Sequence, residues 1–179
     1  MMASNPQQAH SKPGEIQGKG ASDSEQIDIS ISTDQRGVVA EALKTCLADS
    51  YALYFKTLGV HWNVTGAGFY GIHKLTDAQY NELHEAADSI AERIRALGHV
   101  APASFAEFRE LSCVDVDTPH KSTPEMLKEL VADNEAVAKR MLEASDIADE
   151  NDDKFTEDML ISRIGTHEEN AWMLRATIA

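Results

Sequence analysis

The architecture of this chain is set by residues 61–98, which run HWNVTGAGFYGIHKLTDAQYNELHEAADSIAERIRALG. A glycine-containing turn around Gly66 interrupts one helical pattern, and a second pattern follows it at once. The second helix is expected over about 69–97, with Gly98 ending it. Because the connection is short, the two helices are predicted to form an antiparallel hairpin.

The second helix carries two pairs of metal-ligand residue types. His73 pairs with Asp77 and Asp88 pairs with Glu92, each at i, i+4 spacing, so each pair shares one helix face. The four positions fall within an arc of roughly 100°, but Asp77 and Asp88 lie about 16 Å apart along the axis. One metal ion cannot join both pairs within a single chain.

The two pairs can meet only when a second copy of the helix runs antiparallel to the first. Such copies cross near Glu82 and Leu83, and the first pair of one chain then faces the second pair of the other. The spacing therefore predicts a two-fold dimer with two equivalent metal sites at its interface. His61 ends the preceding helix on its apolar face. A lone histidine there is usually a core residue, but the neighbouring ligand pairs favour a fifth ligand.

This pattern resembles the Dps family, the DNA-binding proteins from starved cells, which are miniature ferritins. The resemblance rests on HWN-x-x-G, the histidine twelve residues after the first, the aspartate four residues later and a D-x-x-x-E-R run ending in LG, over roughly positions 50–100. Family members are hollow dodecamers of four-helix subunits that oxidise Fe(II), preferentially with hydrogen peroxide, and store the ferric product. The resemblance implies iron, held by His61, His73 and Asp77 of one subunit with Asp88 and Glu92 of its two-fold mate.

Two further features lie outside that ligand set. Trp62 is predicted either to donate an electron when peroxide meets a single iron or to pack at a subunit interface. In the family, acids in the turn before the last helix line a three-fold pore for iron entry. The matching positions here are Asp149, Asp153 and Asp158, and Lys154 stands where several members carry an acid.

The apolar periodicity predicts an all-α fold, a ferritin-like four-helix bundle with a long crossover carrying a short extra helix. The first helix is expected over about 34–63, and the third begins at the Thr123-Pro124-Glu125 start signal. Their intervening connection is long enough to cross the bundle end to end. No Glu-x-x-His motif occurs in the sequence, which argues against an iron centre inside one subunit, and His167 is predicted to be a core or subunit-contact residue.

The length of 179 residues suits one domain, and the net charge of −14 opposes broad attraction to nucleic acid or anionic membranes. The expected division is a flexible arm over 1–32 and the bundle domain over 33–179. No apolar run is long enough to span a membrane, no secretory signal is evident, and the cysteines form no disulfide framework. The protein is expected to be cytoplasmic, with nucleoid association possible.

Three functions remain open at this stage. An iron-oxidising, iron-storing homo-oligomer, a dodecamer built of two-fold dimers, accounts for the ligand pattern and protects against oxidative stress. A nucleoid protein whose main role is DNA binding is the alternative, although the arm offers only Lys12 and Lys19 for phosphate contacts. The third is a helical assembly whose site is vacant or holds zinc.

Overall fold

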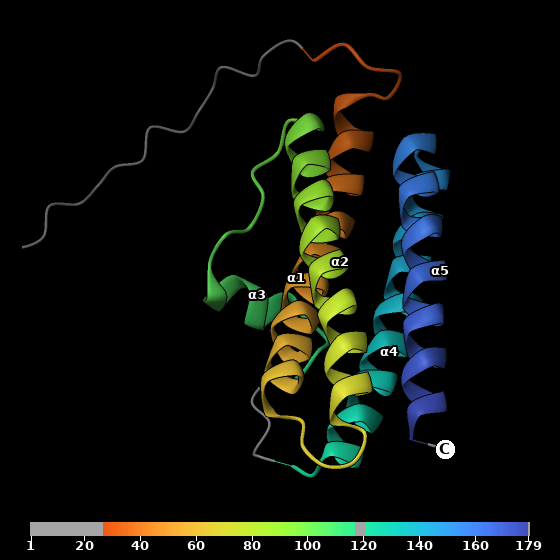
Figure 1. The fold of residues 1–179 in the computed structure, drawn as a ribbon. Helices are drawn as coiled ribbons and strands as arrows, with labels where there is room; N and C mark the ends of the chain where they lie inside the picture. The colour runs from red at the N-terminus through yellow and green to blue at the C-terminus, as the bar shows by residue number, and fades with distance from the viewer. Residues whose placement is uncertain (1–26, 117–120, 179) are drawn as a thin grey trace, which may run out of the picture.

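The computed structural model describes residues 27–116 and 121–178, and within those ranges it contains helices and no strand (Figure 1). The predicted all-α four-helix bundle is confirmed, and a short extra helix lies in the crossover as expected. The helices are α1 (Thr33–Asn63), α2 (Phe69–Ala96), α3 (Phe105–Leu111), α4 (Thr123–Glu150) and α5 (Lys154–Thr177).

Local sequence signals explain where the helices begin. Ser32 and Gln35 form a reciprocal capping box at the start of α1, and Ser122 and Glu125 form another at the start of α4. Thr123, the start signal expected from sequence, is therefore the first helical residue, and the serine before it is the cap. Each box satisfies backbone N–H groups that have no partner within the helix.

The hairpin between α1 and α2 turns at Gly66, whose φ of +99° lies in the left-handed region that favours glycine. The Phe69 amide donates to the Gly66 carbonyl at 3.1 Å, and α2 begins there. The end of α1 and the first turns of α2 are thus neighbours, as the short connection predicted.

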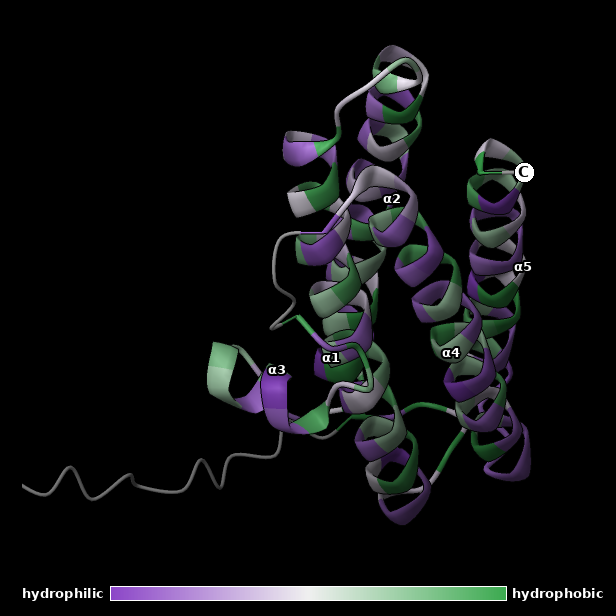
Figure 2. Cartoon of the chain, turned by 90° about the horizontal axis from the view of Figure 1, so that it is seen from below, coloured by the Kyte–Doolittle hydropathy of each residue, from purple (hydrophilic) through white to green (hydrophobic). Residues whose placement is uncertain are grey.

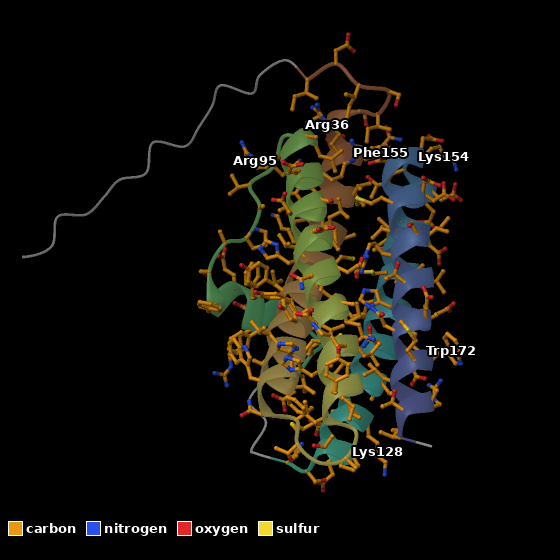
Figure 3. All side chains as sticks on the ribbon, in the orientation of Figure 1. Arg36, Arg95, Lys128, Lys154, Phe155 and Trp172 are labelled. Atoms are coloured by element: carbon orange, nitrogen blue, oxygen red, sulfur yellow. The ribbon has the colours of Figure 1, made fainter. Side chains whose placement is uncertain are left out.

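The crossover runs the length of the bundle. At one end, the Thr65 amide donates to Thr123 Oγ1 and the Thr123 hydroxyl donates to the Thr65 carbonyl, both at 3.1 Å. At the other end, Gln35 Nε2 donates to the Asn151 carbonyl at 3.1 Å. Figure 3 shows the same two ends of the bundle, with Arg36, Arg95 and Lys154 at one end and Lys128 at the other. Helices α2 and α4 are therefore parallel, which is the crossover topology expected from the long connection.

A buried carboxylate fastens this crossover to the bundle. Asp49 of α1 is fully buried, and its Oδ1 accepts hydrogen bonds from Cys113 N at 2.7 Å and Ser112 Oγ at 3.0 Å. Arg140 of α4 donates to the same oxygen at 3.3 Å and to the Leu111 carbonyl at 3.2 Å. Burial raises the pKa of Asp49, and these hydrogen bonds and the Arg140 charge oppose the rise.

The core lies between the four long helices, along which hydrophobic residues, green in Figure 2, recur among polar ones. Each of the four helices contributes large aliphatic side chains that are almost completely buried. These include Leu43, Leu53, Leu83, Ile90, Ile94, Leu130, Met141, Leu160 and Leu174.

Candidate metal centre

Two histidines meet where α1 ends and α2 begins. His61 lies in the last turn of α1 and is 8% exposed, while His73 lies one turn into α2. Their rings stack with centroids 3.8 Å apart and an interplanar angle of 19°. Phe69 stacks on the His73 ring, and the edge of Tyr80 meets the His61 ring at 5.1 Å. This packing holds both imidazoles in fixed orientations.

Reciprocal hydrogen bonds define which nitrogen of each imidazole is available to a metal. His61 Nδ1 lies 3.0 Å from the His73 carbonyl, and His73 Nδ1 lies 3.0 Å from the His61 carbonyl. A carbonyl oxygen can only accept, so each Nδ1 carries the hydrogen and donates it. In the neutral ring, Nε2 is then an unprotonated electron-pair donor. A hydrogen bond from Nδ1 to a backbone carbonyl is a common way in which proteins orient metal-binding histidines.

Asp77 stands one turn beyond His73 on the same face of α2. The Tyr80 hydroxyl donates to Asp77 Oδ1 at 2.9 Å, and Lys74 Nζ lies 3.9 Å from Oδ2. The hydrogen bond to Asp77 raises the pKa of the Tyr80 phenol. The Asp77 side chain is 38% exposed, so its carboxylate keeps lone pairs for a cation.

Asp88 and Glu92 lie further along α2 and are exposed. Neither carboxylate has a hydrogen bond or ion pair within the described part of the chain, so both are free to bind a cation. Over residues 27–116 and 121–178, no three His, Cys, Asp or Glu side chains converge in a way that could hold a metal. Within one chain, the structure stacks His61 on His73, places Asp77 one turn further along α2 and leaves Asp88 and Glu92 apart from them.

The centre of the bundle, where an iron site inside one subunit would lie, is filled by a polar network. His167 of α5 is fully buried, with Nδ1 3.0 Å from Asn134 Oδ1 and Nε2 3.4 Å from Arg163 Nη2. Arg163 also forms a bidentate ion pair with Glu82 of α2. Burial, together with the Arg163 charge, lowers the pKa of His167 to about 3. The prediction that His167 is a core residue is confirmed.

The three acids assigned to a pore have different surroundings. Asp149 is exposed and pairs with Lys154, and Asp158 is exposed on α5. Asp153 instead is only 3% exposed and caps α5, and both of its carboxylate oxygens accept from Arg93 Nη2, at 2.7 and 2.8 Å. Burial would raise the pKa of Asp153, but the hydrogen bonds from Arg93 and Thr156 outweigh it and hold the pKa low. Its carboxylate is already committed to this pairing.

Trp62 follows His61 but faces solvent, with 63% of its surface exposed. The rings that contact His61 are those of His73 and Tyr80. Sequence reasoning overlooked Tyr80, although its position three residues after Asp77 places the two on one helix face. That spacing was the available signal for the hydrogen bond.

Comparisons with known proteins agree with this fold. Residues 40–179 match the family described as Ferritin-like domain, and the chain belongs to this ferritin-like family. It is 38% identical over 156 residues to an uncharacterised low temperature-induced protein of Nostoc, covering 85% of this chain and 86% of that protein. It is 31% identical over 140 residues to the DNA protection during starvation protein of Helicobacter pylori, covering 78% and 97%.

A solved structure narrows the classification of this chain within the ferritin-like family. The crystal structure of a Dps protein from Bacillus brevis superimposes with a TM-score of 0.79 at 32% identity, covering 83% of this chain and 100% of that one. Within the ferritin-like class, the chain is therefore a member of the Dps group.

Proposed function

We propose that this protein oxidises Fe(II) to Fe(III), preferentially with hydrogen peroxide, and stores the ferric product, which protects the cell against oxidative stress. The observation that carries the proposal is the pair of reciprocal hydrogen bonds between His61 and His73, each from Nδ1 of one residue to the backbone carbonyl of the other. These hydrogen bonds engage Nδ1 of each ring and leave Nε2 available to a metal, and Asp77 lies one turn beyond His73 on the same face of α2. Imidazole and carboxylate together suit iron, which here is the substrate.

The remaining ligands are supplied by a second subunit. Asp88 and Glu92 are exposed, unpaired within the described residues and on the same helix face as His73 and Asp77. In an antiparallel dimer of α2 helices, the acidic pair of one subunit reaches the His61, His73 and Asp77 set of the other. Two equivalent sites then form at each two-fold axis.

The ligand charges favour the oxidation. Carboxylates stabilise Fe(III) more than Fe(II), because the additional positive charge interacts more strongly with anionic oxygen. Two Fe(II) ions each give one electron to one hydrogen peroxide, which takes up two protons and becomes two waters. Glu92 is the candidate bridge between the two ions. Because both electrons arrive together, no hydroxyl radical is released.

Storage requires a closed assembly, which we propose to be a dodecamer built of these dimers and located in the cytoplasm. A net charge of −14 per chain suits a shell that concentrates cations. Asp149 and Asp158, both exposed, are the stronger candidates for an acidic entry pore, because Asp153 is buried against Arg93, whereas the ion pair of Asp149 with Lys154 lies on the surface. Among the described residues, no helix is long and apolar enough to cross a bilayer.

DNA binding as the main role, with secondary iron oxidation, is the alternative. The arm assigned to it lies mostly in residues 1–26, outside the described residues. Its two lysines are few for an interaction whose strength grows with the number of phosphates neutralised. A gel shift at low and moderate salt separates this alternative, and a metal assay after purification separates a vacant or zinc-filled site.

The direct test loads the apo protein anaerobically with Fe(II) and adds one hydrogen peroxide per two Fe(II). Wild type should oxidise the iron rapidly, and His73→Ala and Asp88→Ala should each slow the reaction by at least about ten-fold. Asp146→Ala, which removes an exposed acid from α4, is the matched control. Oxidation at the wild-type rate in both site variants would refute the assignment.

A further inference from the structure

An arginine side chain lies at the centre of the bundle between two groups of the kind that bind metals. We propose that the Arg163 guanidinium fills a latent divalent-cation site formed by Glu82 and His167, and that its charge keeps Fe(II) out of the bundle. Arg163 thereby confines iron oxidation to the site at His61 and His73. This confinement rests on the ferroxidase function proposed above, whereas the latent site does not.

His167 has the orientation of a metal ligand. Its side chain is fully buried, and its Nε2 lies 3.4 Å from Arg163 Nη2. A guanidinium nitrogen can only donate, so Nε2 is the unprotonated nitrogen and its lone pair points at Arg163. Nδ1 then carries the hydrogen and donates it to Asn134 Oδ1 at 3.0 Å. A hydrogen bond of this kind, on the far side of the ring, is what fixes the metal-binding nitrogen of a ligand histidine.

Glu82 provides the second ligand group, from the facing helix α2. Both of its carboxylate oxygens accept from Arg163, Oε1 from Nη1 and Oε2 from Nη2. The Nη2 atom therefore lies between a carboxylate oxygen and an imidazole nitrogen, 3.1 Å from the first and 3.4 Å from the second. Imidazole with carboxylate is a donor set that suits Fe(II). Ferritin-like bundles hold metals with such groups projecting inward from facing helices, and here the guanidinium stands in the place of the cation.

Arg163 is buried at a cost that an apolar side chain at this position would not carry. The residue is 8% exposed, and burial lowers its pKa to about 10, so it stays charged at neutral pH. Its Nε is buried and has no hydrogen-bond acceptor among the described residues. A buried ion pair is often no more stabilising than well-packed apolar residues of similar volume. The charge is explained by what it excludes, because a second cation at the same place meets strong repulsion.

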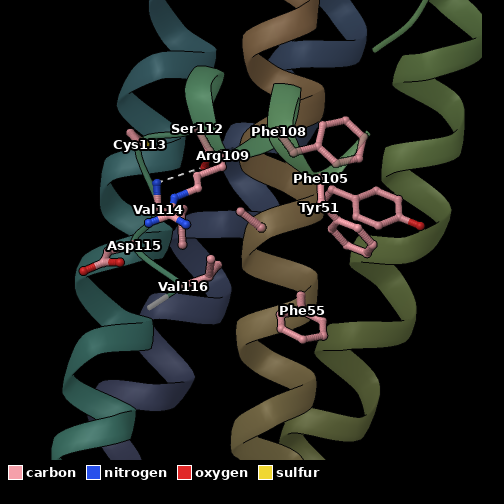
Figure 4. Close-up of a pocket in the computed structure, with 11 residues that line it drawn as sticks. Tyr51, Phe55, Phe105, Phe108, Arg109, Ser112, Cys113, Val114, Asp115 and Val116 are labelled. Carbon is pink, nitrogen blue, oxygen red and sulfur yellow. Dashed lines mark hydrogen bonds between the residues drawn. The ribbon is translucent and has the colours of Figure 1, made fainter. Parts of the chain in front are cut away.

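A hollow lined by acids leads from the surface to this guanidinium. It lies between α2 and α5, has a volume of about 430 Å³, and its lining includes Arg163, Glu82, Glu85, Ser89, Asp158 and Ser162. Glu85 and Asp158 are exposed, so the hollow attracts cations from solvent. A hollow of about 460 Å³ between α1 and the crossover is instead walled by the aromatic rings of Tyr51, Phe105 and Phe108 (Figure 4). Once a cation has entered the α2–α5 hollow, the guanidinium charge is the barrier to its going further.

Exclusion matters for the proposed chemistry because a single Fe(II) held in the bundle would meet peroxide alone. One Fe(II) gives one electron, so hydrogen peroxide then yields Fe(III), hydroxide and a hydroxyl radical inside the subunit. At the proposed interface site, two Fe(II) supply both electrons and the peroxide becomes two waters. With Arg163 in place, peroxide meets iron only where the second electron is at hand.

The test of the latent site measures binding of Co(II), which takes nitrogen and oxygen ligands somewhat more tightly than Fe(II) and reports its coordination by visible absorption. All chains carry His73→Ala, which weakens the interface site. Relative to that parent, Arg163→Ala should bind one further Co(II) per chain with a new visible band, and adding His167→Gln should remove it. Arg163→Lys keeps the charge and should bind none. Arg175→Ala, which removes an exposed arginine of the same helix from an ion pair with Glu135, is the matched control.

Arg163→Gln is measured beside Arg163→Ala, because it keeps an amide donor for Glu82 and loses the charge, and circular dichroism establishes that each variant folds. The latent site is overturned if the folded neutral variants bind no further Co(II), or if Arg163→Lys binds as much as they do.

The role in confinement has its own readout, taken with the interface site intact. With two Fe(II) per interface site and one hydrogen peroxide per two Fe(II), Arg163→Ala should release more hydroxyl radical to a spin trap than wild type. An equal radical yield would overturn the confinement and leave the Co(II) result to decide the latent site. A wild type that oxidises no iron under these conditions would instead overturn the proposed function.

Discussion

Co-assembly of two inactive variants should restore a defined fraction of the iron oxidation. The perturbation is a mixture of His73→Ala and Asp88→Ala chains, unfolded and refolded together in equal amounts. The two ligand pairs are symmetric about residues 82–83 of α2, so an antiparallel partner helix brings the first pair of one chain to the second pair of the other.

The expected magnitude follows from that symmetry. In a mixed dimer, one site lacks both residues, and the other takes His73 from the Asp88→Ala chain and Asp88 from the His73→Ala chain. That second site holds all five ligands. Random pairing makes about half of the dimers mixed, each with one intact site out of two, so about one quarter of the wild-type rate should return.

The assay is peroxide-driven oxidation of anaerobically loaded Fe(II), followed by the absorbance of the ferric product. A mixture of His73→Ala with Asp77→Ala is the control. Both residues belong to the same half-site, so each site of every dimer stays defective and no activity should return. Recovery no greater than the mean of the separate variants, or equal recovery in both mixtures, would refute the shared site.

Three further outcomes follow from other parts of the molecule. The pKa of His167 falls to about 3 in the fold, so the buried neutral form contributes fully to stability above about pH 6.5, and this contribution is lost on acidification by about 1.4 kcal/mol per pH unit. In urea unfolding between pH 4 and 6.5, the unfolding free energy of His167→Gln should therefore change less steeply with pH than that of wild type. An equal slope in the two proteins would contradict this reasoning. Arg93→Met leaves the buried Asp153 carboxylate unpaired and should lower the unfolding free energy by about 3 kcal/mol in urea titrations, whereas a change below about 0.5 kcal/mol would show that the pair contributes little. Replacing both Asp149 and Asp158 by Asn should slow iron uptake into the shell several-fold at low salt while Fe(II) affinity at the oxidation site is retained, and unchanged uptake would argue against this entry route.

Much of the fold was predictable because its signals are local. The glycine turn, the apolar periodicity and the capping pairs act over a few residues, and they placed the hairpin and the beginnings of the long helices. The crossover topology followed from the length of the connection. The start of the third long helix at Thr123 was predicted correctly, and Ser122, the residue before it, supplies the reciprocal cap with Glu125.

The candidate site was predictable in part for the same reason. Spacing along one helix showed that His73 and Asp77 share a face with Asp88 and Glu92 and that no single chain could bring the pairs together. Whether a partner subunit does so remains a prediction. Spacing did not reveal the hydrogen bonds that expose Nε2 of each histidine, because they join backbone and side-chain atoms of two different helices.

By itself, the sequence determined the helices, their order and the residue types that a helix face presents, since a helix has a fixed period and rise. Only the tertiary structure decided which side chains meet across helices. It turned Asp153 inward to Arg93, buried His167 beside Arg163, and aligned Tyr80 with tyrosines that lie a helix away in the chain. Such contacts depend on the rotation and axial offset of one packed helix against another, and these are settled by how the whole core fills its space.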